Sequence, residues 1–244
     1  MSQVDPTQKE RARCFLERAE AALNTDLPPP PELRKAIREI VADSQSDVSK
    51  RHMRSPESAF LNRYIIPKIY LLMQTINGIN KEQARQAFLC EGYANMLQCC
   101  SGTPARTERH PFTKVIGTDV TDIMRKWKDG NGSSLTQACP DFALRDPFPF
   151  KTVFEGKYFE QGSPDKAARD LVTNIYQAFF YRALPYVAPK KSGPPWDYDF
   201  SCLLAYDASP KQTLVAAWNQ LAEPIRHGFW DGANLYVMIL RGRV

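Results

Sequence analysis

Two stretches of sequence decide how this chain folds and where its chemistry lies: Cys139-Pro140-Asp141-Phe142-Ala143-Leu144 and Val153-Phe154-Glu155-Gly156-Lys157-Tyr158-Phe159. Both are apolar runs of strand length, and the proline-containing segment Arg145–Pro149 between them is typical of a turn. We therefore expect two strands that pair with each other, over Leu135–Leu144 and Lys151–Phe159. Residues i and i+2 of a strand face the same side, so Glu155 and Lys157 project together. The pairing brings Glu155 back close to Asp141.

Two carboxylates that converge at the edge of a sheet suit Mg²⁺, which prefers oxygen ligands and keeps several waters. Mn²⁺ prefers the same ligands and could substitute for it. Such an ion lowers the pKa of a bound water and offsets the charge that accumulates on a phosphoryl group. Lys157 beside that water would orient it, help to deprotonate it or stabilise the negative transition state. The pattern thus predicts metal-assisted hydrolysis of a phosphodiester.

The rest of the pattern places these strands in an α/β fold. After them we expect a helix, a strand, a second helix and a last strand, over Pro164–Leu184, Phe200–Tyr206, Thr213–Ile225 and Asn234–Leu240. Before them, helix start signals at Ser55-Pro56-Glu57 open a helix that Pro67 should kink. Two more helices are expected over Lys81–Leu97 and Val120–Lys128. The predicted architecture is a mixed β-sheet flanked by helices.

The N-terminal part is predicted to be separate from this core. Four consecutive prolines, Pro28–Pro31, interrupt the chain between two short amphipathic helices expected over Thr7–Asn24 and Glu32–Ala42. We interpret residues 1–54 as an N-terminal helical arm or cap, and residues 55–244 as the core that carries the chemistry.

Pro140-Asp141 followed by Glu155-Gly156-Lys157 resembles the signature of the PD-(D/E)XK nuclease superfamily, which includes restriction endonucleases, repair nucleases and RecB-type exonucleases. The resemblance implies a restriction endonuclease-like core of αβββαβ topology. It implies that Asp141, Glu155 and the Gly156 carbonyl bind Mg²⁺, and that Lys157 is the catalytic lysine. An acid from the preceding helix often completes such sites, and Glu57 is the best match for it.

A second element of the resemblance lies on the helix after the strands. Gln177 and Tyr181 are four residues apart, so they lie on one helical face. The RecB-like branch carries a similar Gln-x-x-x-Tyr element that lines the active site, which implies a catalytic role for both residues. The chain departs from that branch in having Glu-x-Lys where Asp-x-Lys is usual, and in lacking its iron–sulfur cysteine pattern.

The charge balance is compatible with a nucleic-acid partner. Among 244 residues, 32 Lys and Arg exceed 27 Asp and Glu, which gives a net charge of +5. A mildly basic chain permits a polyanionic partner without demonstrating one. Positive residues gather in the N-terminal half and after the predicted catalytic helix. We expect DNA-backbone contacts from the basic residues Arg34, Lys35, Arg38, Lys50, Arg51, Arg54, Lys190 and Lys191.

Other classes of protein are disfavoured by what the sequence lacks. The six cysteines form no CxxC pair, and the glycine-rich phosphate loop, the serine nucleophile elbow and the HExxH helix are all missing. The first residues are polar, and no apolar stretch reaches the roughly 18 residues of a membrane span. These features predict a cytoplasmic protein with reduced thiols and no membrane association.

The resulting hypothesis is a Mg²⁺-dependent deoxyribonuclease, and the modest length favours an endonuclease over an exonuclease. It would act in restriction, phage defence or repair, as a homodimer or as a subunit of a larger complex. Two alternatives stay open. One is a non-catalytic DNA-binding or assembly subunit with a nuclease-like fold. The other is an unrelated α/β protein in which Asp141 accepts backbone hydrogen bonds and the charged strand is structural.

Overall fold

A computed structural model of the chain describes residues 4–47, 53–90, 140–160, 162–187 and 198–243. Within these ranges five strands form one sheet in the order β1-β2-β3-β4-β5. β1 to β3 are antiparallel neighbours, whereas β3, β4 and β5 run parallel. The strands are β1 Phe88–Cys90, β2 Phe142–Leu144, β3 Thr152–Phe159, β4 Phe200–Asp207 and β5 Leu235–Leu240. The predicted α/β class with a mixed sheet is therefore confirmed.

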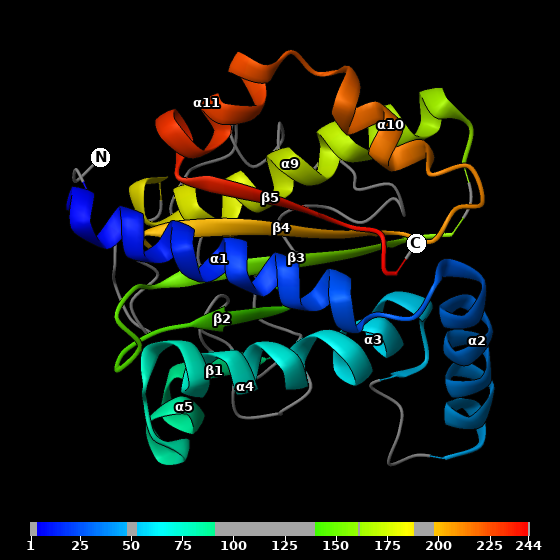
Figure 1. Ribbon diagram of the computed structural model, residues 1–244, viewed down its shortest axis with the longest axis horizontal. Helices are drawn as coiled ribbons and strands as arrows, with labels where there is room; N and C mark the ends of the chain where they lie inside the picture. The colour runs from blue at the N-terminus through cyan, green and yellow to red at the C-terminus, as the bar shows by residue number, and fades with distance from the viewer. Residues whose placement is uncertain (1–3, 48–52, 91–139, 161, 188–197, 244) are drawn as a thin grey trace.

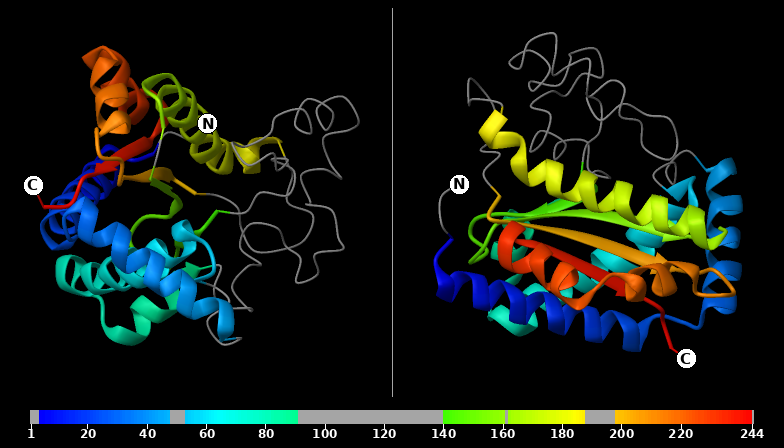
Figure 2. Two further views of the ribbon diagram at one scale, coloured as in Figure 1. Left: turned by 90° about the vertical axis from the view of Figure 1, so that its right-hand side faces the viewer. Right: turned by 90° about the horizontal axis from the view of Figure 1, so that it is seen from above.

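Helices cover both faces of the sheet (Figures 1 and 2). One layer holds three helices: α9 Pro164–Val187, α10 Thr213–Gln220 and α11 Glu223–Ala233. The opposite layer holds α1 Pro6–Asp26, α2 Pro30–Ser46, α3 Pro56–Phe60, the π-helical turn η2 Leu61–Ile65, α4 Ile66–Asn77 and α5 Lys81–Ala87. Alternate residues of β4 enter separate hydrophobic clusters, with Leu203 beneath α9 and Leu204 on the α1 side. None of the described helices combines the length and apolarity that a membrane span needs.

The helix expected from Ser55 onward is continuous but irregular. Ser55 caps it, because its hydroxyl accepts a hydrogen bond from the Ser58 N–H, and Pro56 occupies the first turn. The irregularity at Pro67 takes the form of the π turn η2 immediately before α4. Proline has no N–H for the carbonyl four residues earlier, and a widened turn accommodates that loss. Gly78, with φ of +64°, ends α4 in the left-handed conformation.

Two predicted helices were wrong in their extent. The helix expected over Lys81–Leu97 ends at Ala87, and Phe88 begins strand β1, where its ring stacks on Phe142 at 5.5 Å. A short apolar run is compatible with either structure, and the pairing of β1 with β2 decides it. The helix expected over Thr213–Ile225 is interrupted between α10 and α11. Pro224 lies in the first turn of α11, a position that tolerates proline because its missing N–H has no partner within the helix.

The two N-terminal helices contribute buried side chains to the hydrophobic cluster that includes residues of the sheet. Phe15 of α1 is 1% exposed and packs edge-on against Phe148 and Phe150. α1 also lies along β5, where Glu20 accepts hydrogen bonds from the Tyr236 hydroxyl and the Ile239 N–H. The polyproline segment therefore changes the direction of the chain, but the helix before it still packs against the sheet. The helix expected over Val120–Lys128 lies outside the described residues, as does the part of the first predicted strand before residue 140.

Candidate active site

Asp141 lies at the point where β2 begins and is tied to β3 by two hydrogen bonds. Its N–H donates to the Phe154 carbonyl at 3.1 Å, and its Oδ2 accepts the Gly156 N–H at 2.7 Å. The pairing of β2 with β3 ends at Phe142 opposite Phe154. The N–H and carbonyl of one strand residue point to the same edge. The Gly156 carbonyl therefore points to the edge of β3 that holds the Asp141 carboxylate.

Glu155 and Lys157 form a buried ion pair on the face of β3 that lies toward α9. Lys157 Nζ lies 2.6 Å from Glu155 Oε1, and Glu155 is only 3% exposed. The two residues align with Leu203 and Ala205 of β4, whose side chains pack beneath α9. The predicted common projection of Glu155 and Lys157 is thus present, on the α9 side of the sheet.

Glu57 reaches the same ammonium from the opposite layer. It lies in the first turn of α3, and its Oε1 is 3.3 Å from Lys157 Nζ. Leu61, one turn later, packs directly on Gly156: a Cβ at that glycine would lie 2.3 Å from Leu61 Cδ2. Only a glycine in β3 therefore lets the helix approach closely enough to hold Glu57 at the edge of the sheet.

The electrostatics of this cluster follow from its burial and its excess of carboxylates. Burial, together with the neighbouring Glu155 carboxylate, raises the pKa of Asp141 well above its usual range. Burial alone would lower the pKa of Lys157, but Glu155 and, next, Glu57 outweigh it and raise that pKa above the ordinary lysine value. The lysine is therefore a fixed positive charge and a poor general base.

The predicted pair on α9 is formed and buried. Gln177 Nε2 donates to Tyr181 Oη at 3.0 Å, and the two residues are 5% and 2% exposed. Among the residues that the structure describes, Gln177 Oε1 has no hydrogen-bond partner. α9 packs on β3 and β4, so the pair faces the same side of the sheet as Glu155. An amide oxygen buried in this way needs a polar partner such as water or a ligand group.

No three His, Cys, Asp or Glu side chains in the described ranges are grouped closely enough to form a metal cage. Mg²⁺ does not require such a cage, because one or two carboxylates with waters and a substrate phosphate usually hold it. In a site of that kind, Asp141, Glu155 and the Gly156 carbonyl would be the donors. Three carboxyl groups, of Glu57, Asp141 and Glu155, lie near the one ammonium of Lys157 at this edge.

The residues expected to contact DNA are only partly described. Arg54 is exposed, and its Nε donates to the Ser44 carbonyl at 3.2 Å, so it also holds the end of α2. Arg38 of α2 pairs with Glu160, just beyond β3, at 2.5 Å. α2 therefore carries its basic residues close to the end of the strand that bears Lys157. The other predicted contacts, Lys50, Arg51, Lys190 and Lys191, lie outside the described residues.

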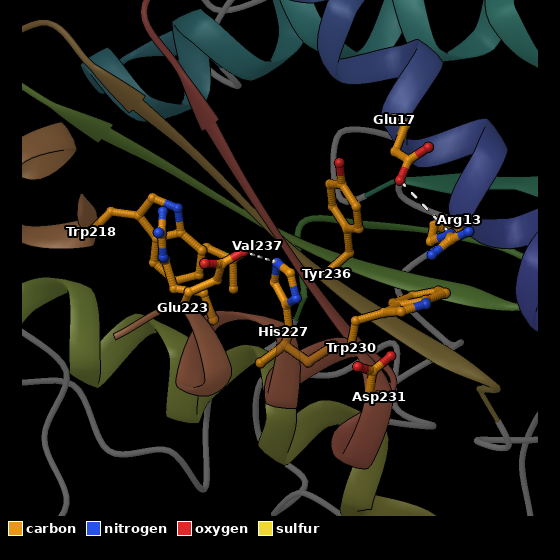
Figure 3. A pocket seen from close by; sticks show the side chains of 11 residues that line it. Arg13, Glu17, Trp218, Glu223, His227, Trp230, Asp231, Tyr236 and Val237 are labelled. Atoms are coloured by element: carbon orange, nitrogen blue, oxygen red, sulfur yellow. Dashed lines mark ion pairs between the residues drawn. The ribbon is translucent and has the colours of Figure 1, made fainter. Parts of the chain in front are cut away.

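Two features of the structure were not predicted from the sequence. Asp207, fully buried at the end of β4, accepts hydrogen bonds from the N–H groups of Ser209, Leu214 and Val215 and from the Ser209 hydroxyl. An acid just before the helix start at Thr213 was the available signal for such a cap. The second feature is a cavity of about 480 Å³ between α1, α11 and β5 (Figure 3).

That cavity is distinct from the predicted site. Its walls include Trp218, Trp230 and Tyr236, and none of the predicted catalytic residues lines it. Its polar side chains are mostly exposed: Arg13 Nε lies 3.8 Å from Glu17 Oε1, and His227 Nε2 lies 3.8 Å from Glu223 Oε1 (Figure 3). The buried Asp141, Glu155 and Lys157 lie instead at the edge of β3.

No protein-family model, no curated protein and no solved structure matches this chain.

Proposed function

We propose that the chain is a Mg²⁺-dependent nuclease that hydrolyses DNA phosphodiester bonds, with a core like that of the PD-(D/E)XK superfamily. One observation carries the proposal: Asp141, Glu155 and Lys157 meet at one edge of β3, tied together by the Asp141–Gly156 hydrogen bond and the Glu155–Lys157 pair. Buried charges of this kind oppose stability and are typical of functional sites. The order α5, β1, β2, β3, α9, β4 supports the αβββαβ core that the resemblance implies.

The residues divide into metal ligands and groups that act on the phosphate. The Asp141 and Glu155 carboxylates and the Gly156 carbonyl would hold Mg²⁺. The ion would activate a water and offset the charge on the phosphoryl oxygens. Lys157 stays protonated between its carboxylates, so its role is to stabilise the negative transition state. Gln177 and Tyr181 would orient these groups or the scissile phosphate from α9.

The proposal extends to partners. DNA would lie along the basic residues of α2 and Arg54, which contact phosphates without reading sequence. We favour an endonuclease, which cuts both strands of a duplex as a homodimer or within a larger restriction, defence or repair complex.

The test is nicking of a supercoiled plasmid by the purified full chain, with Mg²⁺, with Mn²⁺ and with EDTA. The wild type should nick only with a divalent cation, and Asp141→Asn and Lys157→Ala should each lose at least about 100-fold in rate. Asp231→Asn, which changes an exposed carboxylate in the cavity between α1, α11 and β5, should nick like the wild type. DNA binding with no cleavage under any condition would instead identify a non-catalytic subunit. Equal nicking by all variants would overturn the proposed site.

A further inference from the structure

Lys157 occupies a position that conflicts with metal binding at Glu155. Its Nζ lies 2.6 Å from Glu155 Oε1 and 3.3 Å from Glu57 Oε1, so the ammonium bridges one carboxylate from the sheet and one from helix α3. An ammonium and a divalent cation repel each other strongly at such distances in a buried site. Glu155 is 3% exposed, so little water screens the repulsion between Lys157 and a cation on the same carboxylate.

We propose that Lys157 competes with the divalent cation for Glu155. Glu57 is then not a metal ligand but a second carboxylate that forms an ion pair with Lys157. The inference rests on the proposed metal site. In it, Lys157 pairs with both acids before metal binds, and with Glu57 afterwards. Glu57 is then a positioning residue that keeps the ammonium at the edge of β3 when Glu155 becomes a ligand.

The architecture fits this division of roles. Glu57 contacts the site through Lys157. Because Leu61 packs against Gly156, the helix that carries Glu57 is held at β3 and its carboxylate stays within reach of Lys157. The lysine stem has four rotatable bonds, and its head can shift while its backbone stays in β3. With all groups ionised, three carboxylates and one ammonium leave a formal charge of −2. A single divalent cation neutralises that charge only if Glu57 remains with Lys157 in the cluster.

The test is isothermal titration of Mn²⁺ and of Mg²⁺ into the full chain, in the wild type, Lys157→Met, Glu57→Gln and the double variant. Lys157→Met removes the competing charge and should bind metal at least about tenfold more tightly than the wild type. Glu57→Gln should weaken metal binding severalfold in the wild-type background, because Lys157 then pairs with Glu155 alone. In the Lys157→Met background Glu57→Gln should have no effect, which makes the two changes non-additive.

Lys166→Met is the matched control, because Lys166 forms a 2.6 Å pair with Asp170 on the exposed side of α9. It should leave metal affinity unchanged. Where Lys157→Met does not give the wild-type circular dichroism spectrum, Lys157→Gln takes its place.

The outcomes separate this inference from the proposed function. Equal metal affinity in the wild type and Lys157→Met would overturn the competition. An equal loss of metal affinity on Glu57→Gln in both backgrounds would make Glu57 a metal ligand and overturn its role as the ion-pair partner of Lys157. Absence of metal binding in all four proteins would overturn the proposed metal site itself, and with it the inference.

Discussion

Gly156 is the residue of β3 against which the helical layer packs at the candidate site. Its N–H binds Asp141, and its missing side chain makes room for Leu61. Gly156→Ala would place a methyl group 2.3 Å from Leu61 Cδ2. We expect a loss of about 1–3 kcal/mol in the free energy of unfolding, since this is the usual cost of overpacking a core. Urea denaturation measures it.

Gly228 gives the matched control for that substitution. It lies inside α11, and a Cβ there would meet nothing within 4 Å. Gly228→Ala should raise stability by up to about 1 kcal/mol because alanine is the better helix former. A Gly156→Ala protein as stable as the wild type would show that Leu61 does not hold α3 against β3.

Glu20 predicts a pH dependence of stability. Burial raises its pKa above the ordinary 4.5, against the effect of the hydrogen bonds from Tyr236 and Ile239. A carboxyl with a raised pKa in the folded state binds more protons folded than unfolded, so its stabilising contribution is present below the ordinary pKa and is lost as pH rises through the folded one. Glu20→Gln removes this titration. The free energy of unfolding of the variant minus that of the wild type should therefore increase between about pH 4 and pH 7.

Urea unfolding at several pH values checks this, with Glu39→Gln, an exposed acid of α2, as the control. A difference for Glu20→Gln that stays constant or falls with pH would contradict the assignment.

At the scale of the element, Asp207 sets the start of α10. Its two carboxylate oxygens accept four hydrogen bonds, two of them from the Leu214 and Val215 N–H groups in the first turn. Asp207→Ala leaves these buried donors without their acceptor, so we expect a loss of about 2–4 kcal/mol in thermal or urea unfolding. Asp165→Ala, in the exposed first turn of α9, should cost well under half of that. Similar losses for both variants would mean that Asp207 is not a special cap.

The elements that bear the site could be predicted because their signals are local. Alternation along β3 placed Glu155 and Lys157 on one face, and spacing along α9 placed Gln177 beside Tyr181. The end of α5 could not be predicted in this way. Phe88 is a strand residue because β2, more than 50 positions later, pairs with it. Its own sequence is compatible with a helix.

At the scale of the whole molecule, α1 and the sheet share one hydrophobic core. Phe15 lies in the same cluster as Phe148, Phe150 and Phe200. Phe15→Ala should therefore destabilise the chain by about 3–5 kcal/mol and shift a single cooperative transition. Ile225→Ala, at a 52% exposed position, should stay within about 0.5 kcal/mol of the wild type. A separate early transition for residues 1–54, with the main one unchanged, would instead favour an independent arm.

The contact of Glu57 with Lys157 shows why the complete site could not be predicted from the sequence. The two residues are 100 positions apart, one in α3 and one in β3, and they meet because Leu61 packs on Gly156. Nothing in the local pattern of either residue encodes that fit. The resemblance suggested Glu57 for the site, whereas its partner is visible only in the fold.

The most direct test of the central claim is the single-turnover rate at which the purified chain cleaves an end-labelled DNA duplex at saturating Mg²⁺. We predict cleavage by the wild type, none in EDTA, and a rate about 10²–10³-fold lower for Lys157→Ala, with Lys166→Ala unchanged. Failure of the wild type to cleave, or equal rates for Lys157→Ala and the wild type, would contradict a nuclease centre at Asp141, Glu155 and Lys157.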